Sequence, residues 1–339
     1  MTAQAAENRY APQTLTALRH FWYPVALSTD VGSEPFACEL LEEPIVLYRT
    51  NDAMTAARDV CPHRGTRLSG GWLEENCLVC PYHGLRYDGD GRCVAIPAAG
   101  LGSRIPGNIR LRTFQVTERY GLVWVSLESD PIVPMPDWSA LEREDLQSIC
   151  LPPAEWNASA GRHAENFNDV AHLSWIHAST FGNRGDPVIK PYEVEQRRTG
   201  LDRTFIYNQV DRDTFETGRQ VITPMTYAYR FTYPFSSALT ISASDGRELH
   251  IFDAVCPAAP TRSKIFIRLA KNYEPEKSMD ALVAFQEAVN EEDRRVVESQ
   301  TPKMLPLDPR LECHIIADAW SLRFRKGFAK LGLDPAAYV

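Results

Sequence analysis

Residues 61–84 read CPHRGTRLSGGWLEENCLVCPYHG and contain two short hooks of metal-binding residues. The first hook is Cys61-Pro-His63 and the second is Cys80-Pro-Tyr-His83, with sixteen residues between them. Two thiolates and two imidazoles are accepted by zinc and by iron–sulfur clusters. Glycines flank both hooks, so two loop tips can close over a metal centre without Cβ clashes. We therefore expect the chain to be organised around a metal site held by these loops.

The order of ligands within the hooks separates the two kinds of metal centre. Zinc fingers usually pair cysteine with cysteine in one hook and histidine with histidine in the other. Here each hook is mixed, as expected if its first residue binds one iron and its second residue binds the other. Two imidazoles in place of two thiolates raise the reduction potential of such a cluster. The pattern resembles a Rieske [2Fe–2S] site, and a Cys₂His₂ zinc site is the alternative.

Length and composition indicate a globular protein of two domains. Of its 339 residues, 44% are hydrophobic and 24% are charged, which are ordinary globular values. The net charge of −8 argues against nucleic-acid binding, which requires clustered Lys and Arg. Residues 1–13 lack the apolar region of a secretion signal, and no run approaches about 18 apolar residues. We expect a soluble, cytoplasmic protein without a membrane segment.

The cysteines support the same compartment. Two of the eight belong to the hooks, and the other six show no pairing pattern. Cysteines of this kind behave as small, mostly buried hydrophobic residues in a reducing environment. We expect all of them to be free of disulfides.

The hydrophobic pattern predicts a strand-rich first half. Residues 15–28 read as a short helix or lead-in with a bulky apolar face, and strands follow, separated by turns rich in Gly, Asp and Asn. Asp88-Gly-Asp-Gly91 marks a clear turn. The hooks should therefore lie on loops of a small all-β domain, which ends at the proline-rich run 130–136. The predicted strands lie within 34–50, 54–61, 85–97 and 111–128.

The second half predicts one antiparallel sheet with helices on one face. A helix is expected over 161–177, and two more over about 278–300 and 317–331. Alternating segments between them read as strands. These strands are 205–212, 222–235, 239–244, 248–256 and 263–273.

A second metal site is indicated by residues 163–177, HAENFNDVAHLSWIH. Asp169 and His172 are three residues apart and share a helix face, and Asn166 precedes them. His172 and His177 lie about 140° apart on a regular helix, so only a helix that ends or bulges between them would let both imidazoles converge. Two ordinary core or surface histidines are the alternative.

The predicted helix 278–300 supplies a carboxylate for this site. Its apolar stripe consists of Leu282, Phe285, Val289 and Val296. Asp293 lies in the middle of the stripe, whereas Glu291 and Glu292 point about 160° and about 100° away from it. A carboxylate facing the core is costly unless it is paired or binds a metal. With two histidines it would complete the ligand set of a non-haem Fe(II). A buried salt bridge to Arg262, Arg268 or another cation is the alternative.

From about Leu18 to about Phe328 the chain resembles the oxygenase component of a Rieske non-haem iron oxygenase. It is most similar to the group of methylxanthine N-demethylases, vanillate-type O-demethylases, dicamba and toluenesulfonate methyl monooxygenases, and saxitoxin-pathway hydroxylases. The segments that carry the resemblance are LRHFWYPV (18–25), CPHRG (61–65), CPYHG (80–84), ERYGLVWV (118–125), ENFNDVAHLSWIH (165–177) and EEDRRVVESQTP (291–302).

The resemblance implies an α+β fold of two parts. A lead-in at 1–22 would pack on the catalytic domain, 23–130 would form the all-β Rieske domain, and 131–339 would form the catalytic domain. The latter would be an antiparallel sheet flanked by helices, of the helix-grip or START type.

The resemblance also assigns roles to the metal-binding residues. Cys61 and Cys80 would bind one iron of the cluster, His63 and His83 the other, and His172, His177 and Asp293 the mononuclear Fe(II), with Asn166 nearby. Asp169 would bridge His172 to a Rieske histidine of the neighbouring subunit in a head-to-tail homotrimer. Asn166 and Asp169 are thus the expected catalytic residues.

The resemblance also implies a partner, namely a flavin and iron–sulfur reductase, with or without a ferredoxin, that supplies electrons from NADH or NADPH. The sequence contains no flavin- or dinucleotide-binding fingerprint, which agrees with electrons coming from another protein. The resemblance implies that O₂ and these electrons are used to hydroxylate, or to O- or N-demethylate, a small aromatic, heteroaromatic or alkaloid-like substrate. Aromatic cis-dihydroxylation, a Rieske electron carrier without catalysis and a zinc-stabilised binding protein are the alternatives.

The substrate pocket is expected between the sheet and the helix that carries Asp293. An aromatic-rich pocket would suit a flat, mostly apolar ring. The histidines without an assigned role are His20, His163, His250 and His314, of which His163 is nearest to the second site in sequence. The candidate lining residues are Phe205, Tyr207, Tyr227, Phe231, Leu239, Ile241, His250, Phe252 and Phe285.

Overall fold

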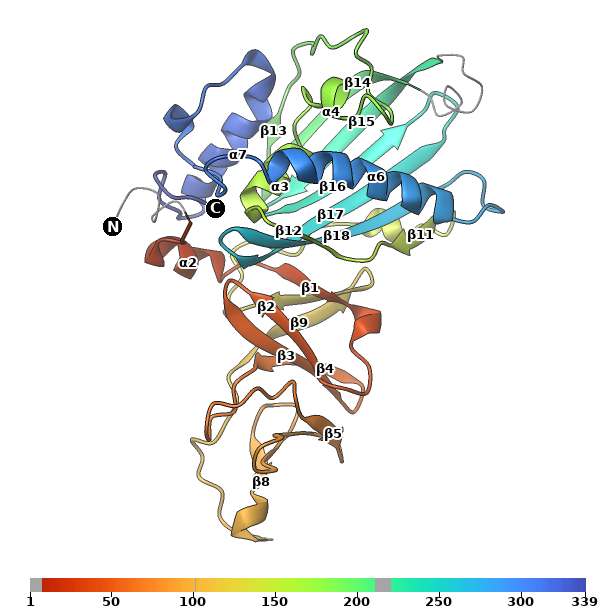
Figure 1. The fold of residues 1–339 in the computed structure, drawn as a ribbon. Coiled ribbons are helices and arrows are strands. Elements are labelled where there is room, and N and C mark those ends of the chain that lie inside the picture. The colour runs from red at the N-terminus through yellow and green to blue at the C-terminus, as the bar shows by residue number, and fades with distance from the viewer. Residues whose placement is uncertain (1–7, 101, 211–220) are drawn as a thin grey trace. The chain divides into compact units, whose positions relative to one another are not determined.

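The computed structural model of the chain describes residues 8–100, 102–210 and 221–339, which form two units (Figure 1). One unit is Arg19–Ile132. The other joins the described residues up to Leu18 with Val133–Val339. Each unit contains its own sheets, and each holds one of the two predicted metal-binding motifs.

The unit Arg19–Ile132 is built from two antiparallel sheets. The larger has the strand order β1-β10-β9-β4-β3-β2, and the smaller has the order β5-β6-β7-β8. Two 3-10 turns, η1 (Ser28–Asp30) and η2 (Pro97–Ala99), accompany them. The strands of the larger sheet are β1 (Tyr23–Leu27), β2 (Phe36–Leu40), β3 (Glu43–Thr50), β4 (Ala53–Arg58), β9 (Thr113–Arg119) and β10 (Leu122–Ser126). Those of the smaller are β5 (Trp72–Glu74), β6 (Cys77–Val79), β7 (Arg86–Tyr87) and β8 (Cys93–Ala95).

The predicted turn at 88–91 is confirmed and joins β7 to β8. The Asp88 carboxylate accepts hydrogen bonds from the backbone N–H groups of Asp90 and Arg92, at 3.0 and 2.8 Å. Gly91 adopts φ +76°, a conformation that favours glycine. The small sheet therefore closes over one apolar core that contains Tyr48, Tyr87 and the two hook cysteines.

The second unit is an eight-stranded antiparallel sheet. Its order is β11-β18-β17-β16-β15-β14-β13, and β12 pairs with β18. The five strands expected here are confirmed, although 211–212 of the first of them lie outside the described residues. The strands are β11 (Gln147–Cys150), β12 (Ala154–Trp156), β13 (Glu195–Gln196), β14 (Gly200–Val210), β15 (Ile222–Thr232), β16 (Ser236–Ser242), β17 (Glu248–Ala259) and β18 (Arg262–Lys271).

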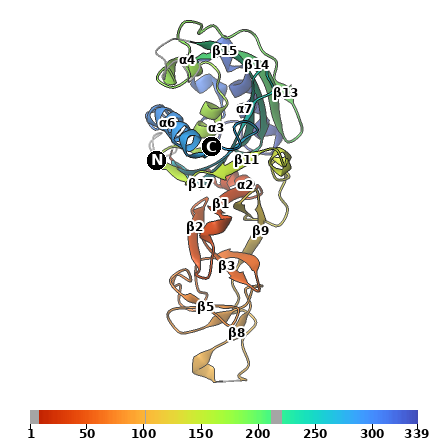
Figure 2. The same cartoon turned by 90° about the vertical axis from the view of Figure 1, so that its right-hand side faces the viewer.

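Helices cover one side of this sheet. Figure 2 shows the sheet curving around α3 (Ala160–Phe167) and α6 (Asp280–Val297). The aromatic face of α7 packs on β15, with the rings of Phe324 and Phe231 5.2 Å apart. The predicted antiparallel sheet flanked by helices is therefore confirmed. The remaining helical elements are α2 (Pro12–Leu18), α4 (Leu173–Ile176), α7 (Ala319–Lys330), η3 (Ser139–Glu142), η4 (Pro309–Leu311) and η5 (Ile316–Asp318).

Two sequence predictions about helices need correction. The single helix expected over 161–177 is two helices, because α3 ends at Phe167 and α4 begins only at Leu173. The Asp169 carboxylate accepts hydrogen bonds from the backbone N–H groups of Ala171 and His172, at 3.1 and 3.0 Å. Such side-chain bonds compete with the helical pattern and end it. The lead-in at 15–28 is helical only to Leu18 and becomes a strand at Tyr23.

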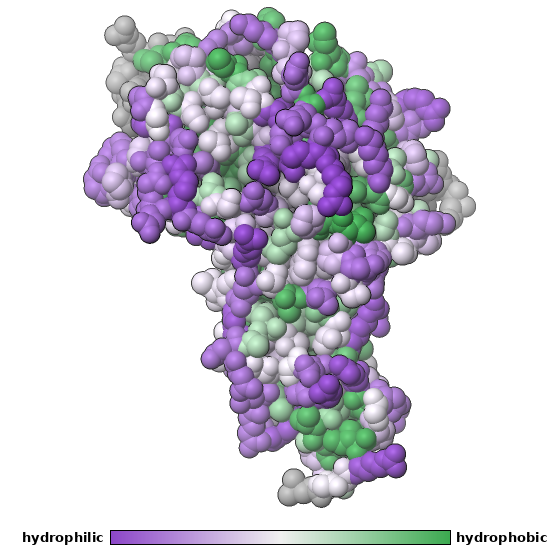
Figure 3. Space-filling view, turned by 180° about the vertical axis from the view of Figure 1, so that it is seen from behind, coloured by the Kyte–Doolittle hydropathy of each residue, from purple (hydrophilic) through white to green (hydrophobic). Residues whose placement is uncertain are grey.

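The surface is mixed in character. Seen from behind in Figure 3, hydrophilic residues predominate and hydrophobic ones form separate small groups. Within the described residues, no helix has the length and apolar character needed to cross a bilayer. None of the eight cysteines forms a disulfide, as expected.

Candidate metal centres

The two cysteine hooks have the same backbone geometry. In the first, the N–H of Cys61 donates to Thr66 O at 2.8 Å, and the N–H of Gly65 donates back to Cys61 O at 2.8 Å. In the second, Cys80 and Gly84 repeat this pattern at 2.9 and 3.0 Å. Both glycines have positive φ, +76° and +70°, which explains why glycine follows each hook. Two equivalent loops thus present their ligands in the same way.

The four side chains divide into a buried pair and an exposed pair. Cys61 and Cys80 are each 1% exposed within the core of the unit, whereas His63 and His83 lie at the surface. The two imidazole rings are 4.6 Å apart and steeply inclined to each other, at 63°. A cluster with one iron held by thiolates and the other by imidazoles needs the two cysteines together and the two histidines together, as they lie here. The residues present therefore fit a Rieske cluster.

Hydrogen bonding and burial define the electrostatics around the thiols. The Tyr87 hydroxyl lies 3.2 Å from Cys61 Sγ. Burial raises the pKa of Cys80, and the adjacent thiol of Cys61 adds to the shift. Burial and the contact with Cys61 also raise the pKa of Tyr87. Two neighbouring buried thiols both lose their protons when a metal binds them, so the pair is suited to holding a cationic cluster.

A buried carboxylate fixes the loop between the hooks. Asp59 is 2% exposed and accepts hydrogen bonds from the backbone N–H groups of Leu68 and Ser69, at 2.6 and 2.8 Å. It also accepts from the Ser69 hydroxyl at 2.6 Å. The loop after the first hook is therefore anchored to the end of β4, a contact that no pattern in the sequence indicates.

In the other unit, His172, His177 and Asp293 come together. One ligand atom of each lies within 4.8 Å of the others. Oδ1 of Asp293 is 3.5 Å from Nε2 of His172 and 3.4 Å from Nε2 of His177. The two histidines flank the single turn of α4, as its N-cap and C-cap residues. The helix between the two histidines is this single turn and it ends before His177, whereas a regular helix through both would direct their rings about 140° apart.

The opposite nitrogen of each imidazole is held by a carboxylate. Nδ1 of His172 is 3.1 Å from Asp169 Oδ2, and Nδ1 of His177 is 2.8 Å from Glu292 Oε2. Carboxylates in this position fix the tautomer and ring orientation of a metal-binding histidine. Both Nε2 atoms are therefore directed at the space beside Asp293, and the three residues fit the two-histidine, one-carboxylate set of non-haem iron.

The pKa shifts agree with this geometry. Burial lowers the pKa of His177, which favours its neutral form. Burial also opposes the charged form of His172, but the hydrogen bond to Asp169 and the charge of Asp293 raise the pKa of His172 overall. Burial acts against ionised Asp169, and the bond to His172 more than offsets it and lowers the pKa of Asp169 to about 2. Asp169 is thus a carboxylate at neutral pH.

Asp293 lies on the buried face of α6, but the face differs in part from the predicted one. Leu282 and Val289 are buried as expected, whereas Val296 is 38% exposed and its place is taken by Val297. The buried face of α6 is therefore rotated slightly from the predicted stripe, toward Val297, and it still contains Asp293. The ion pairs of Asp293 among the described residues are with the two histidines. Asn166 donates a hydrogen bond to its Oδ1 at 3.3 Å.

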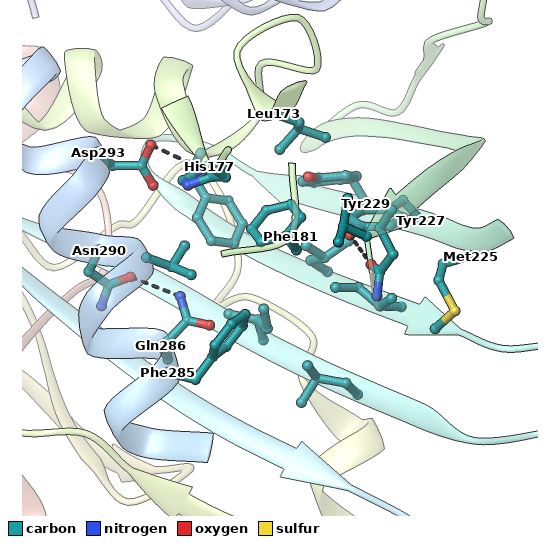
Figure 4. A pocket seen from close by; sticks show the side chains of 18 of the residues that line it. Leu173, His177, Phe181, Met225, Tyr227, Tyr229, Phe285, Gln286, Asn290 and Asp293 are labelled. Carbon is teal, nitrogen blue, oxygen red and sulfur yellow. Dashed lines mark hydrogen bonds and ion pairs between the residues drawn. The ribbon is translucent and has the colours of Figure 1, made fainter. Parts of the chain in front are cut away.

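His172, His177, Asp293 and Asn166 line one cavity of about 460 Å³ inside the unit. Figure 4 shows Asp293 facing His177, with Gln286 and Asn290 hydrogen-bonded to each other on α6. Rings of Phe181, Tyr227, Tyr229 and Phe285 form much of the remaining wall. The cavity wall therefore combines aromatic and aliphatic side chains with polar groups on α6 and at the candidate metal centre, and Arg247, Glu274 and Lys277 add charged groups to it.

Four of the nine residues predicted to line the pocket do so: Tyr227, Leu239, Ile241 and Phe285. The other five, Phe205, Tyr207, Phe231, His250 and Phe252, are not among the lining residues. Phe231 packs against Phe324 of α7, and Phe252 lies 5.2 Å from Trp138. Alternation along a strand gives the face of the sheet, but not which part of that face borders the cavity.

Two contributions to the site were not foreseen. Glu292, predicted to point away from Asp293, reaches His177 and also accepts hydrogen bonds from Ser179 and Thr180. Its position next to Asp293 was the only available signal. Arg203, 4% exposed, is enclosed by four aromatic rings, the nearest being Tyr229 with its centroid at 4.1 Å. Nothing in the sequence marks this buried cation.

Comparison with known proteins identifies the class. Residues 21–114 match the Rieske [2Fe-2S] domain family, and residues 156–333 match the vanillate O-demethylase oxygenase C-terminal domain family. The chain belongs to this family of Rieske oxygenase components. It is an oxidoreductase that uses a [2Fe–2S] cluster, mononuclear iron and O₂, with electrons supplied by a reductase. The second match accounts for the residues that a lone electron carrier would leave unexplained.

The individual relatives include two demethylases of Pseudomonas putida. The chain is 34% identical to methylxanthine N1-demethylase NdmA over 93% of its own length and 89% of that protein. It is 31% identical to methylxanthine N3-demethylase NdmB, over 94% and 91%. The solved structure of Pseudomonas putida CBB5 NdmA with caffeine matches with a TM-score of 0.83 and 31% identity, covering 92% of this chain and 90% of that one. Dicamba monooxygenase, at 22% identity, shares the fold with a TM-score of 0.78.

Proposed function

We propose that this chain hydroxylates a methyl group carried on nitrogen or oxygen of a small heteroaromatic ring, so that the product loses formaldehyde and is demethylated. Simple hydroxylation of a ring substituent belongs to the same proposal. The supporting observation is that Nε2 of His172, Nε2 of His177 and Oδ1 of Asp293 converge at the wall of an aromatic cavity. The names of the similar methylxanthine, dicamba and vanillate demethylases support this substrate class.

The mononuclear iron would be held by His172, His177 and Asp293. The Rieske cluster would be held by Cys61, Cys80, His63 and His83. When bound, the two centres together supply two electrons for the reduction of O₂. The protein orients the ligands of the iron: Asp169 fixes the ring of His172, and Glu292 that of His177. Asn166 holds the Asp293 carboxylate in place through its 3.3 Å hydrogen bond.

The cavity would bind the substrate through flat contacts and a few polar ones. Phe181 stacks on His177 at 4.7 Å, so an aromatic wall continues directly from the metal-binding histidines. On α6, Gln286 Nε2 donates to Asn290 Oδ1 at 2.8 Å. The Gln286 Oε1 acceptor and the Asn290 Nδ2 donor are not used in this bond, which suits a ring with carbonyl and nitrogen groups. Apolar walls also exclude water from the reacting methyl group.

We further propose that electrons pass between subunits of a head-to-tail homotrimer. Asp169 would accept hydrogen bonds from His172 of its own chain and from a Rieske histidine of a neighbour. Its side chain is 25% exposed, and both His63 and His83 lie at the surface. Each end of the bridge is therefore accessible from outside its unit. The reductase would draw on NADH or NADPH through flavin and iron–sulfur groups, with or without a ferredoxin.

The proposed domain division is 1–22 as the lead-in, 23–130 as the Rieske domain and 131–339 as the catalytic domain. Unit boundaries at Leu18/Arg19 and Ile132/Val133 lie within a few residues of these positions and support it. A cytoplasmic location is proposed on the strength of the cysteines, none of which is in a disulfide.

The test begins with the purified, anaerobically reduced protein. About three irons per chain and a Rieske EPR signal are expected from the two ligand sets. A panel of N- and O-methylated heteroaromatic compounds, including caffeine, is then screened for O₂ uptake and formaldehyde release with a reductase. Use of ¹⁸O₂ should place one labelled oxygen in the released formaldehyde, which is trapped before it exchanges with water, or in the product of simple hydroxylation. Two labelled oxygens in a ring diol would contradict the proposal, as would a zinc-containing protein without the signal.

A further inference from the structure

A buried histidine–aspartate pair lies in the same unit and outside the metal-binding cluster. Nε2 of His163 is 2.9 and 3.1 Å from the two carboxylate oxygens of Asp253. Their side chains are only 4% and 1% exposed. The pair joins α3 to β17 across the interior of the sheet, and no step of the proposed reaction uses it.

His163 also borders the cavity. It lies three residues before Asn166 and four before Phe167 on α3, so all three share one face of that helix, and all three line the cavity. Its ring contacts Trp156, another lining residue, edge to face at 4.6 Å. His163 is thus part of the wall that a bound ligand would meet, one helical turn from the residue that holds Asp293.

The contact with Asp253 determines what the other ring nitrogen can do. A carboxylate only accepts hydrogen bonds, so Nε2 of His163 must carry a proton. In the neutral ring Nδ1 then offers a lone pair. Nδ1 is buried and has no hydrogen-bond partner in the part of the chain that the structure describes. Buried polar atoms are nearly always satisfied, so an unpaired acceptor on a side chain of the cavity wall is explained by a bound ligand that donates to it.

We propose that His163, held in one orientation and tautomer by Asp253, is a specificity-determining residue that accepts a hydrogen bond from a ring N–H or O–H of the substrate. This inference rests on the proposed use of the cavity as the substrate site. Substrates with a free N–H or O–H at the matching position are bound in preference to analogues in which that group is methylated. Asp253 acts through His163 and is a positioning residue.

Theobromine and caffeine are matched probes, because theobromine carries a ring N–H where caffeine carries N–CH₃. Their Kd values are measured by calorimetry with the anaerobic, iron-loaded protein and four variants. One hydrogen bond of ordinary strength corresponds to about a five- to tenfold change in Kd. The ratio of affinities, theobromine over caffeine, is therefore expected to fall about five- to tenfold in His163→Phe. It should fall similarly in Asp253→Asn, which no longer fixes the tautomer.

A control and a rescue distinguish recognition from packing. Phe167→Leu alters the same wall without a polar atom, so it should weaken both probes alike and keep their ratio within about twofold of the wild type. His163→Gln retains a side-chain acceptor and should preserve part of the preference for theobromine over caffeine. The same variant takes the place of His163→Phe in the test if His163→Phe does not fold. An unchanged ratio in all His163 and Asp253 variants overturns the inference, as does failure of both probes to bind the wild type. Iron content and formaldehyde release are read separately, so the proposed function can stand when this inference fails.

Discussion

Glu292 Oε2 lies 2.8 Å from Nδ1 of His177, while the next residue, Asp293, lies 3.4 Å from Nε2 of the same ring. Two consecutive residues of α6 therefore hold opposite sides of one imidazole. Glu292 is itself fixed by hydrogen bonds from Ser179 and Thr180. The ring of His177 can neither rotate nor exchange tautomers without breaking one of these contacts. Helix α6 therefore supplies the candidate ligand Asp293 and also, through Glu292, fixes the orientation of His177.

Removing this carboxylate should weaken the mononuclear site without touching the Rieske site. Glu292→Ala leaves Nδ1 of His177 without its acceptor, and loss of such a contact typically costs about 10- to 100-fold in metal affinity. Iron is quantified after dialysis against a chelator, with the Rieske EPR signal as internal standard. Glu291→Ala is the control, because Glu291 pairs with Arg294 and Arg295 instead. Equal iron retention in both variants would remove Glu292 from the site.

Asp169→Asn tests the proposed electron bridge. An asparagine can still accept one hydrogen bond but carries no charge, so both metals should remain bound while turnover falls sharply. The measurement is single-turnover oxidation of the reduced Rieske cluster in the presence of substrate, together with iron content. Near-normal cluster oxidation would eliminate the bridging role, and loss of iron would show that Asp169 mainly supports His172.

The candidate metal ligands could be singled out from the sequence because metal binding constrains the type and spacing of residues. Mixed Cys/His hooks have few uses, and a carboxylate on an apolar stripe demands a partner, so the sequence alone was enough to single out Asp293. The apolar-stripe argument could not single out Glu292, because its side chain leaves the helix about 100° away from that of Asp293. Glu292 contacts the site only because His177 lies between the two carboxylates.

The fold was predictable in its strands and less so around the site. Alternation identified the long strands of the sheet, since each has one covered face. The break after Phe167 was not predicted, because it depends on a side chain, Asp169, bonding to local backbone instead of pointing outward. The lining of the cavity depends on which residues of a strand pack on neighbouring elements, as Phe231 packs on Phe324 and Phe252 on Trp138, and single-strand patterns do not contain that information.

Metal binding to the second site near pH 6.5 should release protons mainly from His172. The pKa of His172 is raised by Asp169 and Asp293 against the effect of burial, whereas burial lowers that of His177. At pH 6.5 His172 is therefore the more protonated of the two, so most of the protons released on metal binding come from it. Affinity should rise with pH until the raised pKa of His172 is passed and then level off. Calorimetry of Zn²⁺ binding in two buffers of different ionisation enthalpy counts the protons, and two protons per ion would contradict this assignment.

Gly71→Ala should disrupt the first metal centre through packing alone. A Cβ at this position would lie 2.0 Å from Val79 O and 3.1 Å from Leu68 O. Both are backbone atoms, and Val79 directly precedes Cys80, so the loop must shift. Overpacking of this kind costs about 1–3 kcal/mol. Gly70→Ala is a matched control, since its nearest contacts are at 3.9 Å. Lower cluster content and a lower Tm are expected for position 71 only.

Tyr87→Phe should lower the reduction potential of the Rieske cluster. The Tyr87 hydroxyl lies 3.2 Å from Cys61 Sγ, and its raised pKa keeps it protonated. It therefore donates to a thiolate that becomes more electron-rich on reduction, which stabilises the reduced cluster. If the bond is stronger by about 1 kcal/mol in the reduced state, its loss lowers the potential by about 40 mV for this one-electron couple.

The matched control for this change is Tyr48→Phe. Tyr48 is a second buried tyrosine of the same core, and its hydroxyl donates to Asp88 O at 2.9 Å instead of to a cysteine. Both variants lose one hydroxyl and one hydrogen bond, so a shift caused by general loosening of the core would appear in both. The potential is measured by redox titration followed by circular dichroism or EPR. A drop confined to Tyr87→Phe assigns the effect to the hydroxyl–thiolate contact, and equal shifts in the two variants would rule that assignment out.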